Sequence, residues 1–254
     1  MPIVEVRDVA KTFHIPTVRR HTLREHALDL FRPRPTERLP VLRSVSFDVA
    51  AGETVAIMGR NGCGKTTLLK IVAGIYRPDH GSVTVRAPVT PILELGLGWN
   101  PELDAIDNIF LIGSVMGLSL REIRAAVDAI LDFAGLERFA NQKLQHYSSG
   151  MAARLAYAIA FHAVREVLIL DEIFAVGDAG FKARCEERYR QLAAAGHTIL
   201  LVSHNPDLVA TFCDRAVLLE DGRVALDDAA KTVADVYVRL LTGEERGGAA
   251  WRSE

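Results

Sequence analysis

A glycine-rich stretch directly after an apolar run is the feature that most constrains how this chain folds. Thr54–Met58 forms the apolar run, and Gly59 to Thr67 then fits the pattern G-x-x-x-x-G-K-[ST]. A helical stretch with Leu68, Leu69 and Ile71 follows. Backbone N–H groups of such a loop turn toward one phosphate, and the positive end of the helix dipole adds to the attraction. The order strand, loop, helix therefore predicts a phosphate-binding loop in an α/β fold.

The side chains of this loop suit a nucleoside triphosphate with its metal ion. Lys65 is expected to bridge the β- and γ-phosphates and to take part in catalysis, while the Thr66 hydroxyl is expected to bind Mg²⁺. Cys63 lies beside Lys65 and the helix N-terminus, so an activated thiol is expected. We predict ATP and Mg²⁺ as cofactors. The predicted nucleotide-binding residues of the loop are Gly59, Arg60, Asn61, Gly62, Cys63, Gly64, Lys65, Thr66 and Thr67.

Two adjacent acids end a second apolar run, Val167–Leu170. Asp171 is expected to hold Mg²⁺ through water, and Glu172 to act as the general base for the attacking water. Either acid alone would fit a surface turn, but downstream of a phosphate loop the catalytic interpretation is preferred. His204 follows a third run, Thr198–Val202, and is expected at the same sheet edge, in contact with the γ-phosphate or the attacking water.

The three apolar runs predict a parallel sheet that helices cover on both faces. Alternating residues at Ile3–Val9 and Val45–Val49 predict an antiparallel lead-in sheet. Helical stretches at Leu120–Ala134 and Met151–Val164 predict a helical subdomain, inserted at about 94–163. One domain is expected over 1–242, ending in a helix at Ala229–Leu241, with a disordered tail over 243–254.

A basic insertion is predicted at about 14–40. It holds six arginines against three acids, with Leu23, Ala27, Leu30 and Phe31 at helical spacing. A short amphipathic helix in a long loop is expected. Packing of its apolar stripe on the parent domain and a docking role remain equal alternatives.

Composition excludes several classes. Hydrophobic residues at 49%, charged residues at 24% and a net charge of -2 leave no basic excess for nucleic acid. The longest mostly apolar stretch, Ile109–Leu120, is too short to span a membrane, and the first residues lack a secretory signal, so a cytoplasmic chain is expected. The three cysteines are far apart and indicate neither a disulfide framework nor a zinc site.

Tyr147–Met151 reads Tyr-Ser-Ser-Gly-Met and resembles the L-S-G-G-Q signature of ABC ATPases, although it alone would also fit a helix N-cap. Ser148 and Gly150 match the functional positions of that motif. Asp178, in Ala-Val-Gly-Asp, matches the aspartate of the family's D-loop. The resemblance implies two ATP molecules between two copies of the chain, each signature contacting the γ-phosphate held by the other copy.

The stretch Glu94–Leu103 resembles that of ATPases that export O-antigen, capsule or teichoic acid. This branch implies an exporter of lipid-linked polysaccharide, peripheral on the cytoplasmic face of the inner membrane and bound to an integral-membrane subunit. Glu94 would replace the family's metal-contacting glutamine. Residues 14–40 would contact the glycan, with Arg19, Arg20 and Arg24 suited to pyrophosphate. Phe13 would stack on adenine, with a core position as the alternative.

Three other functions remain as alternatives. The chain could serve an exporter of another lipid or small molecule. Soluble ABC ATPases of DNA repair or translation usually carry coiled-coil insertions or paired cassettes, which are absent from this sequence. A regulatory subunit that does not hydrolyse ATP is disfavoured because the proposed catalytic residues are all present.

Overall fold

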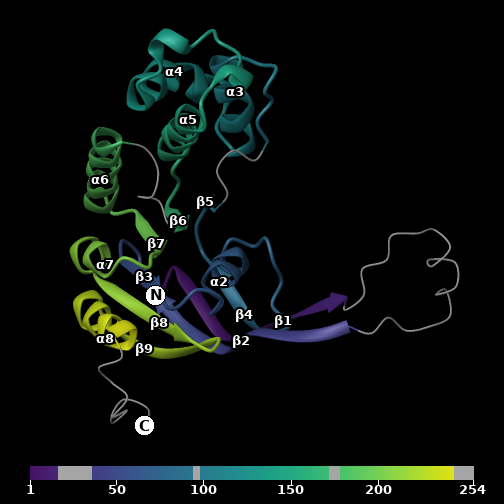
Figure 1. Cartoon of the computed structure of the whole chain (residues 1–254), viewed down its shortest axis with the longest axis vertical. Helices are drawn as coiled ribbons and strands as arrows, with labels where there is room; N and C mark the ends of the chain where they lie inside the picture. Colours follow the sequence, from purple (N-terminus) through teal and green to yellow (C-terminus); the bar gives the residue numbers. More distant parts are fainter. Residues whose placement is uncertain (17–35, 94–97, 172–177, 243–254) are drawn as a thin grey trace, which may run out of the picture.

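The computed structural model describes residues 1–16, 36–93, 98–171 and 178–242. Figure 1 shows two sheets near each other with a group of helices beyond one end. Among the described residues, no helix has both the length and the apolar character that a bilayer crossing requires.

The first sheet is antiparallel and has the strand order β2-β1-β4. Its strands are β1 (Val4–Pro16), β2 (Thr36–Val49) and β4 (His80–Val85). The second sheet has the order β5-β6-β7-β3-β8-β9, in which only β9 is antiparallel to its neighbour. Its strands are β3 (Thr54–Met58), β5 (Val89–Ile92), β6 (Val167–Asp171), β7 (Thr198–Val202), β8 (Arg215–Glu220) and β9 (Arg223–Ala229). The predicted α/β class, with a parallel core and an antiparallel lead-in sheet, is confirmed.

Helices connect the strands of the second sheet, and three of them form the subdomain between β5 and β6. The helices are α2 (Lys65–Val72), α3 (Ala105–Val115), α4 (Leu120–Ala134), α5 (Ser149–His162), α6 (Ala179–Ala194), α7 (Pro206–Phe212) and α8 (Ala230–Thr242), with short 3₁₀ turns at Glu137–Phe139 and Leu144–His146. Ser119 caps α4 through a capping box with Glu122, which explains why this helix begins at Leu120.

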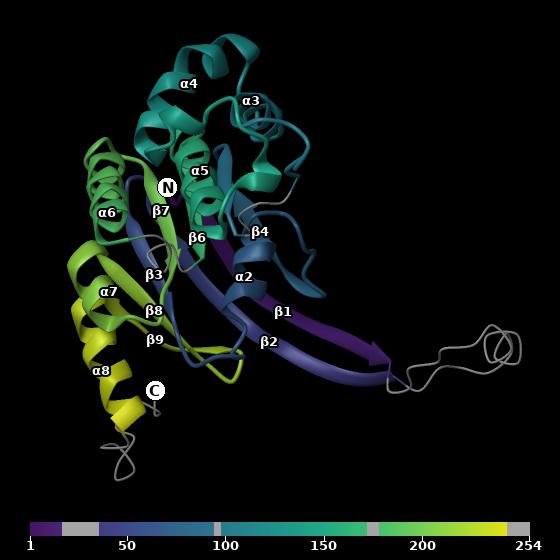
Figure 2. The same cartoon turned by 45° about the horizontal axis from the view of Figure 1, so that its top comes forward.

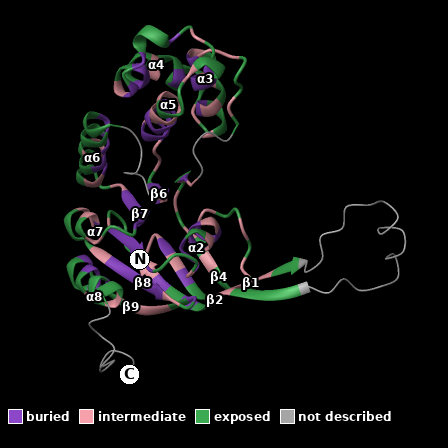
Figure 3. Cartoon of the chain, viewed as in Figure 1, coloured by how far each residue is buried: buried purple, intermediate pink, exposed green. Residues whose placement is uncertain are grey.

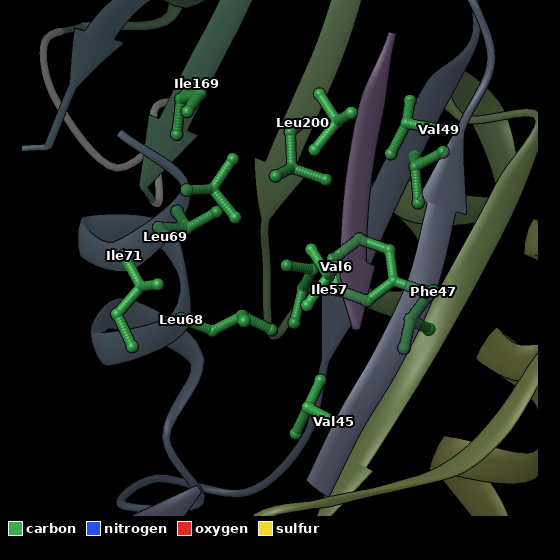
Figure 4. Packing of buried hydrophobic residues seen from close by; sticks show 14 of the residues in the cluster. Val6, Val45, Phe47, Val49, Ile57, Leu68, Leu69, Ile71, Ile169 and Leu200 are labelled. Carbon is green, nitrogen blue, oxygen red and sulfur yellow. The ribbon is translucent and has the colours of Figure 1, made fainter. Parts of the chain in front are cut away.

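The core that positions the phosphate loop lies between the two sheets (Figure 4). Leu68 and Leu69 of α2 pack with Ile57 of β3 on one side and with Val6 and Phe47 of the antiparallel sheet on the other. All of these side chains are buried, and burial of each stabilises the fold by about 2 kcal/mol. The loop is thereby attached to a helix held by both sheets.

The other face of the parallel sheet is covered by helices. Successive side chains of β3 point to opposite faces of the sheet. Ile57 lies in the core between the two sheets, whereas Ala56 and Met58 lie in the core on the face that α7 and α8 cover. Farther along, Tyr157 of α5 and Phe181 of α6 pack on the β6 and β7 side. The central strands β6, β7, β3 and β8 are accordingly buried, whereas the outer helix faces are exposed (Figure 3).

The ends of the predicted insertion differ from expectation. His14–Pro16 and residues 36–40 lie in β1 and β2, paired as far as Pro16 with Thr36, so the two strands form a long arm (Figure 2). Mutual hydrogen bonding lets both strands continue past their alternating segments, and Pro40 is tolerated because β2 is an edge strand. The helix expected around Leu23 and Phe31, within residues 17–35, lies outside the described residues, as does the tail 243–254.

Gly81 is predicted to be one of the least replaceable residues of the antiparallel sheet. Its φ is +79°, and an added Cβ would overlap the carbonyl oxygens of Arg7 and Asp8. Gly74 has a similar φ of +75° but nothing within 4 Å of the added Cβ. We expect Gly74→Ala to cost about 1 kcal/mol in unfolding free energy and Gly81→Ala roughly 3 kcal/mol or more, measured by urea denaturation. Equal losses would contradict this packing argument.

Candidate functional site

The phosphate loop connects β3 to α2, as the sequence predicts. Gly59, with a φ of +146°, sits at the close approach of the loop to β8, where a Cβ would overlap the Leu219 carbonyl oxygen and lie 2.7 Å from the Cys63 sulfur. The backbone of α2 begins at Lys65, directly after Gly64. This local structure directs the N-terminal N–H groups of α2 toward the carboxyl edge of the parallel sheet.

Lys65 is bound by the loop itself. Its Nζ donates to the carbonyl oxygens of Gly59 at 2.8 Å and of Arg60 at 3.1 Å, and the residue is only 7% exposed. A buried ammonium requires such acceptors. Phosphate oxygens arriving at the loop would offer this donor stronger, charged partners.

Thr66 and Asp171 meet at the start of α2 and the end of β6. The Thr66 hydroxyl donates to a carboxylate oxygen of Asp171 at 2.8 Å, although the two residues are 105 positions apart in the chain. Hydroxyl and carboxylate oxygens are the hard ligands that Mg²⁺ prefers. The donor set therefore fits the ion, and these two residues would hold it while the ion neutralises charge on the phosphates.

A cavity of about 640 Å³ opens over this pair. Its described lining includes Asn61, Lys65, Thr66, Asp171 and Val202. The volume is in the range of small-molecule sites, and polar residues make up much of the lining. A triphosphate in this cavity would meet the loop amides, the Lys65 cation and the predicted metal ligands together.

His204 occupies the position that its sequence context predicts, two residues beyond the end of β7. Since β7 lies between β3 and β6, His204 follows the strand between the phosphate loop and Asp171. Its side chain is exposed, and Asn205 after it caps α7. A role in contacting the γ-phosphate stays a prediction.

Glu172 and Glu94 fall within 172–177 and 94–97, which lie outside the described residues. Their assignments as general base and metal contact therefore stay predictions. Asp178, the next described residue after Asp171, marks where the chain enters α6.

The signature and D-loop residues both cap helices. Ser148 is the N-cap residue directly before α5, and its Oγ accepts from the Met151 N–H at 3.2 Å. Asp178 begins α6, and its carboxylate accepts from the Phe181 N–H at 2.9 Å, which together with the nearby Arg154 lowers the pKa of Asp178. Gly150 is exposed. The N-cap alternative thus describes Ser148 correctly, while contact of Ser148 and Gly150 with a nucleotide held by a second copy stays a prediction.

The expectation of an activated Cys63 thiol was wrong. Burial raises the pKa of Cys63 above its ordinary value, and the nearby Lys65 charge, which lowers it, is the smaller effect. The thiol is half-buried and faces a second cavity, of about 730 Å³, beside the loop. Desolvation disfavours the thiolate more than one cation favours it.

This pKa predicts slow labelling of Cys63 by maleimide at pH 7, accelerating as alkali forms more of the reactive thiolate. Burial raises the pKa of Cys185 and Cys213 to about 12, so both should react more slowly still. Labelling rates between pH 7 and 10, with peptide mapping, test this prediction. ATP should protect Cys63. If Cys63 reacted at pH 7 as fast as an exposed thiol of low pKa does, the prediction of slow labelling would be contradicted.

Phe13 is not among the described residues that line either cavity. Its ring meets Tyr76 edge-on at 5.8 Å between centroids, and the Lys11 Nζ lies 5.7 Å from its centroid. Stacking on adenine stays a prediction. Two residues near the site were missed: Val41, which lines both cavities, and Tyr237, whose hydroxyl lies 3.5 Å from the Gly59 carbonyl oxygen. No local sequence pattern marks either residue, because each reaches the loop only through tertiary packing.

Known proteins resemble this chain over most of its length. The chain is 42% identical to the ABC transporter protein AbcA of Aeromonas salmonicida, over 96% of this chain and 79% of that protein. It is 40% identical to the O-antigen export system ATP-binding protein RfbB of Klebsiella pneumoniae, over 79% of this chain and 81% of that protein. It is 35% identical to the teichoic acids export ATP-binding protein TagH of Bacillus anthracis, over 83% of this chain and 38% of that protein.

The solved structure of an ATP-binding subunit of an ABC transporter has a TM-score of 0.72 to this chain, at 25% identity over 97% of this chain and 95% of the other. A phosphate loop between two sheets, with Asp171 beside Thr66, defines a phosphate-loop ATPase. The family model described as ABC transporter matches residues 42–175. The chain belongs to this ABC transporter family, whose ATP-binding subunits hydrolyse ATP.

Proposed function

We propose that this chain is the ATP-hydrolysing subunit of an exporter that moves a lipid-linked polysaccharide across the cytoplasmic membrane. The observation that carries the proposal is the resemblance, at 40% identity, to an O-antigen export ATP-binding protein over 79% of the chain. The teichoic acid relative supports the same substrate class at 35% identity. In addition to this resemblance, the chain has every residue that the phosphate-loop pattern requires.

The chemistry follows from the site. Lys65 would leave the carbonyl oxygens of Gly59 and Arg60 to bind phosphate oxygens, and Thr66 and Asp171 would hold Mg²⁺, which would neutralise charge on the phosphates. Glu172 takes the proton of the attacking water, and His204 orients that water or the γ-phosphate. Once ATP is bound, these groups stabilise the charge that develops on the phosphates, which is the main source of rate in phosphoryl transfer.

Two copies act together in this proposal. Ser148 and Gly150 of one copy close over the nucleotide held by the phosphate loop of the other, with Asp178 at the same interface. Support comes from the exposed N-terminal end of α5, because the positive end of a helix dipole attracts phosphate. Hydrolysis then reopens the dimer.

A membrane subunit receives this motion, which places the chain peripherally on the cytoplasmic face. Leu111 and Val115, four residues apart on α3, are 38% and 75% exposed, and Leu120 at the start of α4 is 63% exposed. Apolar side chains that gather on one helix face at a surface indicate a protein contact. This part of the helical subdomain therefore supports docking of the integral-membrane partner.

The glycan contact is a separate element of the proposal. Residues 14–40 carry Arg19, Arg20 and Arg24, whose guanidinium groups suit the pyrophosphate of a lipid carrier. The described ends of this segment pair in the long arm formed by β1 and β2 (Figure 1).

We expect replacement of Arg19, Arg20 and Arg24 together by alanine to reduce export while ATP hydrolysis by the assembled complex stays largely intact. The expected contact of these arginines is with the substrate, whereas ATP hydrolysis depends on the phosphate loop and the acids at the end of β6. Unchanged export by the triple variant would refute the glycan contact but leave the ATPase assignment standing.

Reconstitution tests the substrate class itself. The complex of this chain with its membrane subunit is placed in proteoliposomes, and phosphate release is followed with and without polyprenyl-pyrophosphate-linked glycan. Stimulation by the linked glycan but not by a drug-like amphiphile is expected. The reverse pattern would favour the alternative exporter of another small molecule.

A further inference from the structure

Helix α6 holds the C-terminal ends of two helices of the helical subdomain. The Arg184 guanidinium donates to the carbonyl oxygen of Asp132 at 2.9 Å, in the last turn of α4. The Arg188 guanidinium donates to the carbonyl oxygen of Phe161 at 3.2 Å, in the last turn of α5. Two arginines one turn apart on one helix thus bind two helix ends.

These carbonyls are natural targets for arginine. The last four carbonyl groups of a helix have no partner within it, and the helix dipole makes that end negative. The Asp132 carbonyl oxygen also accepts from the Gly135 N–H at 2.9 Å, as part of the C-cap of α4, so Arg184 is its second donor. A guanidinium at a helix C-terminus adds a favourable charge, and its planar group loses less side-chain entropy per hydrogen bond than a lysine does. Both contacts join α6 to backbone, so they depend on helix position rather than on side-chain identity.

The contacts between α5 and α6 advance in the same direction along both helices. Arg154 pairs with Asp178 at 3.8 Å, Tyr157 meets Phe181 at 6.3 Å between ring centroids, and Phe161 accepts from Arg188. The two helices therefore run side by side in parallel (Figures 1 and 2). Their N-terminal ends, with Ser148 on one helix and Asp178 on the other, lie at the same end of the pair.

Aromatic packing stiffens this assembly at the level of the arginines. Phe133 of α4 lies 5.9 Å from Phe161 of α5 and 5.8 Å from Phe181 of α6, between ring centroids, edge-on in both cases. Edge-to-face pairs add about 1 kcal/mol each beyond the burial of their area. The three helices are thus joined by hydrogen bonds and by rings.

We propose that Arg184 and Arg188 are positioning residues that keep the signature end of α5 in register with the D-loop end of α6. The inference rests on the proposed dimer, in which both ends face the nucleotide of the partner copy. Loss of the Arg184 contact loosens α4 from α6, and loss of the Arg188 contact loosens α5, so that the α4–α5 pair can shift along α6. Ser148 and Asp178 would then no longer reach the partner's nucleotide together, although the phosphate loop of each copy would be unaffected.

The test measures dimerisation and nucleotide binding separately in the full-length chain. In a Glu172→Gln background, which should trap the ATP-bound dimer, Arg184→Gln with Arg188→Gln is expected to weaken ATP-dependent dimerisation about tenfold by analytical ultracentrifugation. Affinity of the monomer for a fluorescent ATP analogue should stay unchanged. A variant with Arg188→Lys in place of Arg188→Gln keeps a cationic donor at this position. It should dimerise more tightly than the double glutamine variant.

Lys182→Gln is the matched control, because it removes one exposed cation from the same helix. It should leave dimerisation unchanged. The inference would be overturned if the double variant dimerised as tightly as its Glu172→Gln parent. It would also be overturned if dimerisation, ATP affinity of the monomer and melting temperature all fell together, because that pattern indicates general destabilisation. A Glu172→Gln parent that binds ATP but never dimerises would instead refute the proposed dimer, and this inference with it.

Discussion

Replacing Glu172 with glutamine is expected to lower ATP turnover by about 10² to 10⁴-fold while ATP binding is retained. Glutamine keeps the size and hydrogen-bonding capacity of the side chain but cannot accept the proton of the attacking water. The position follows Asp171, whose carboxylate contacts Thr66 at 2.8 Å, so the lost function lies within the predicted metal and phosphate site. Phosphate release at saturating Mg-ATP measures the effect.

Glu166→Gln serves as the control for this substitution. Glu166 is exposed just before the opposite end of the same strand, β6, and carries the same chemical change away from the site. The ATP turnover of the Glu166→Gln variant should match that of the wild-type chain. A Glu172→Gln variant with wild-type turnover would mean that the chain uses another base or is a regulatory subunit without hydrolysis.

Lys65→Ala is expected to abolish tight ATP binding and to lower turnover on the order of 10³-fold. The ammonium is the buried cation of the loop, and its present partners are the carbonyl oxygens of Gly59 and Arg60. Without it, the loop lacks the cation that is expected to bridge the β- and γ-phosphates. Isothermal titration with ATP and phosphate release together measure the loss.

Lys70→Ala on the same helix provides the comparison. The Lys70 Nζ lies 5.6 Å from the Tyr76 ring centroid, and its loss should change stability by less than about 1 kcal/mol and leave turnover near the wild-type value. ATP binding by Lys65→Ala at wild-type affinity would contradict the placement of the phosphates.

Much of the fold could be predicted because its strands are short apolar runs. Thr54–Met58 and Thr198–Val202 are strands with the bounds that their composition indicates, and Leu120–Ala134 is a helix because Ser119 and Glu122 cap it locally. The length of β1 and β2 could not be predicted in the same way. Past Val9 the alternation weakens, and pairing across the arm, such as Phe13 with Leu39, decides where the strands end.

The site shows the same division between local and tertiary information. The contact of Thr66 with Asp171 could be predicted because the motif and the edge of a parallel sheet fix both positions. The pKa of Cys63 could not, since burial opposes the Lys65 charge and its extent depends on residues far along the chain. The contacts of Arg184 and Arg188 on α6 could not be predicted either, because their acceptors are backbone carbonyls, which no sequence pattern marks.

The central claim is that ATP hydrolysis at this site drives polysaccharide export, and surface polysaccharide in the native host tests it most directly. The gene is deleted, and either the wild-type chain or Glu172→Gln is supplied at equal expression. The account predicts that the wild-type chain restores surface glycan, whereas with Glu172→Gln lipid-linked glycan accumulates inside the cell. Normal surface glycan in the deletion strain or with Glu172→Gln would contradict it.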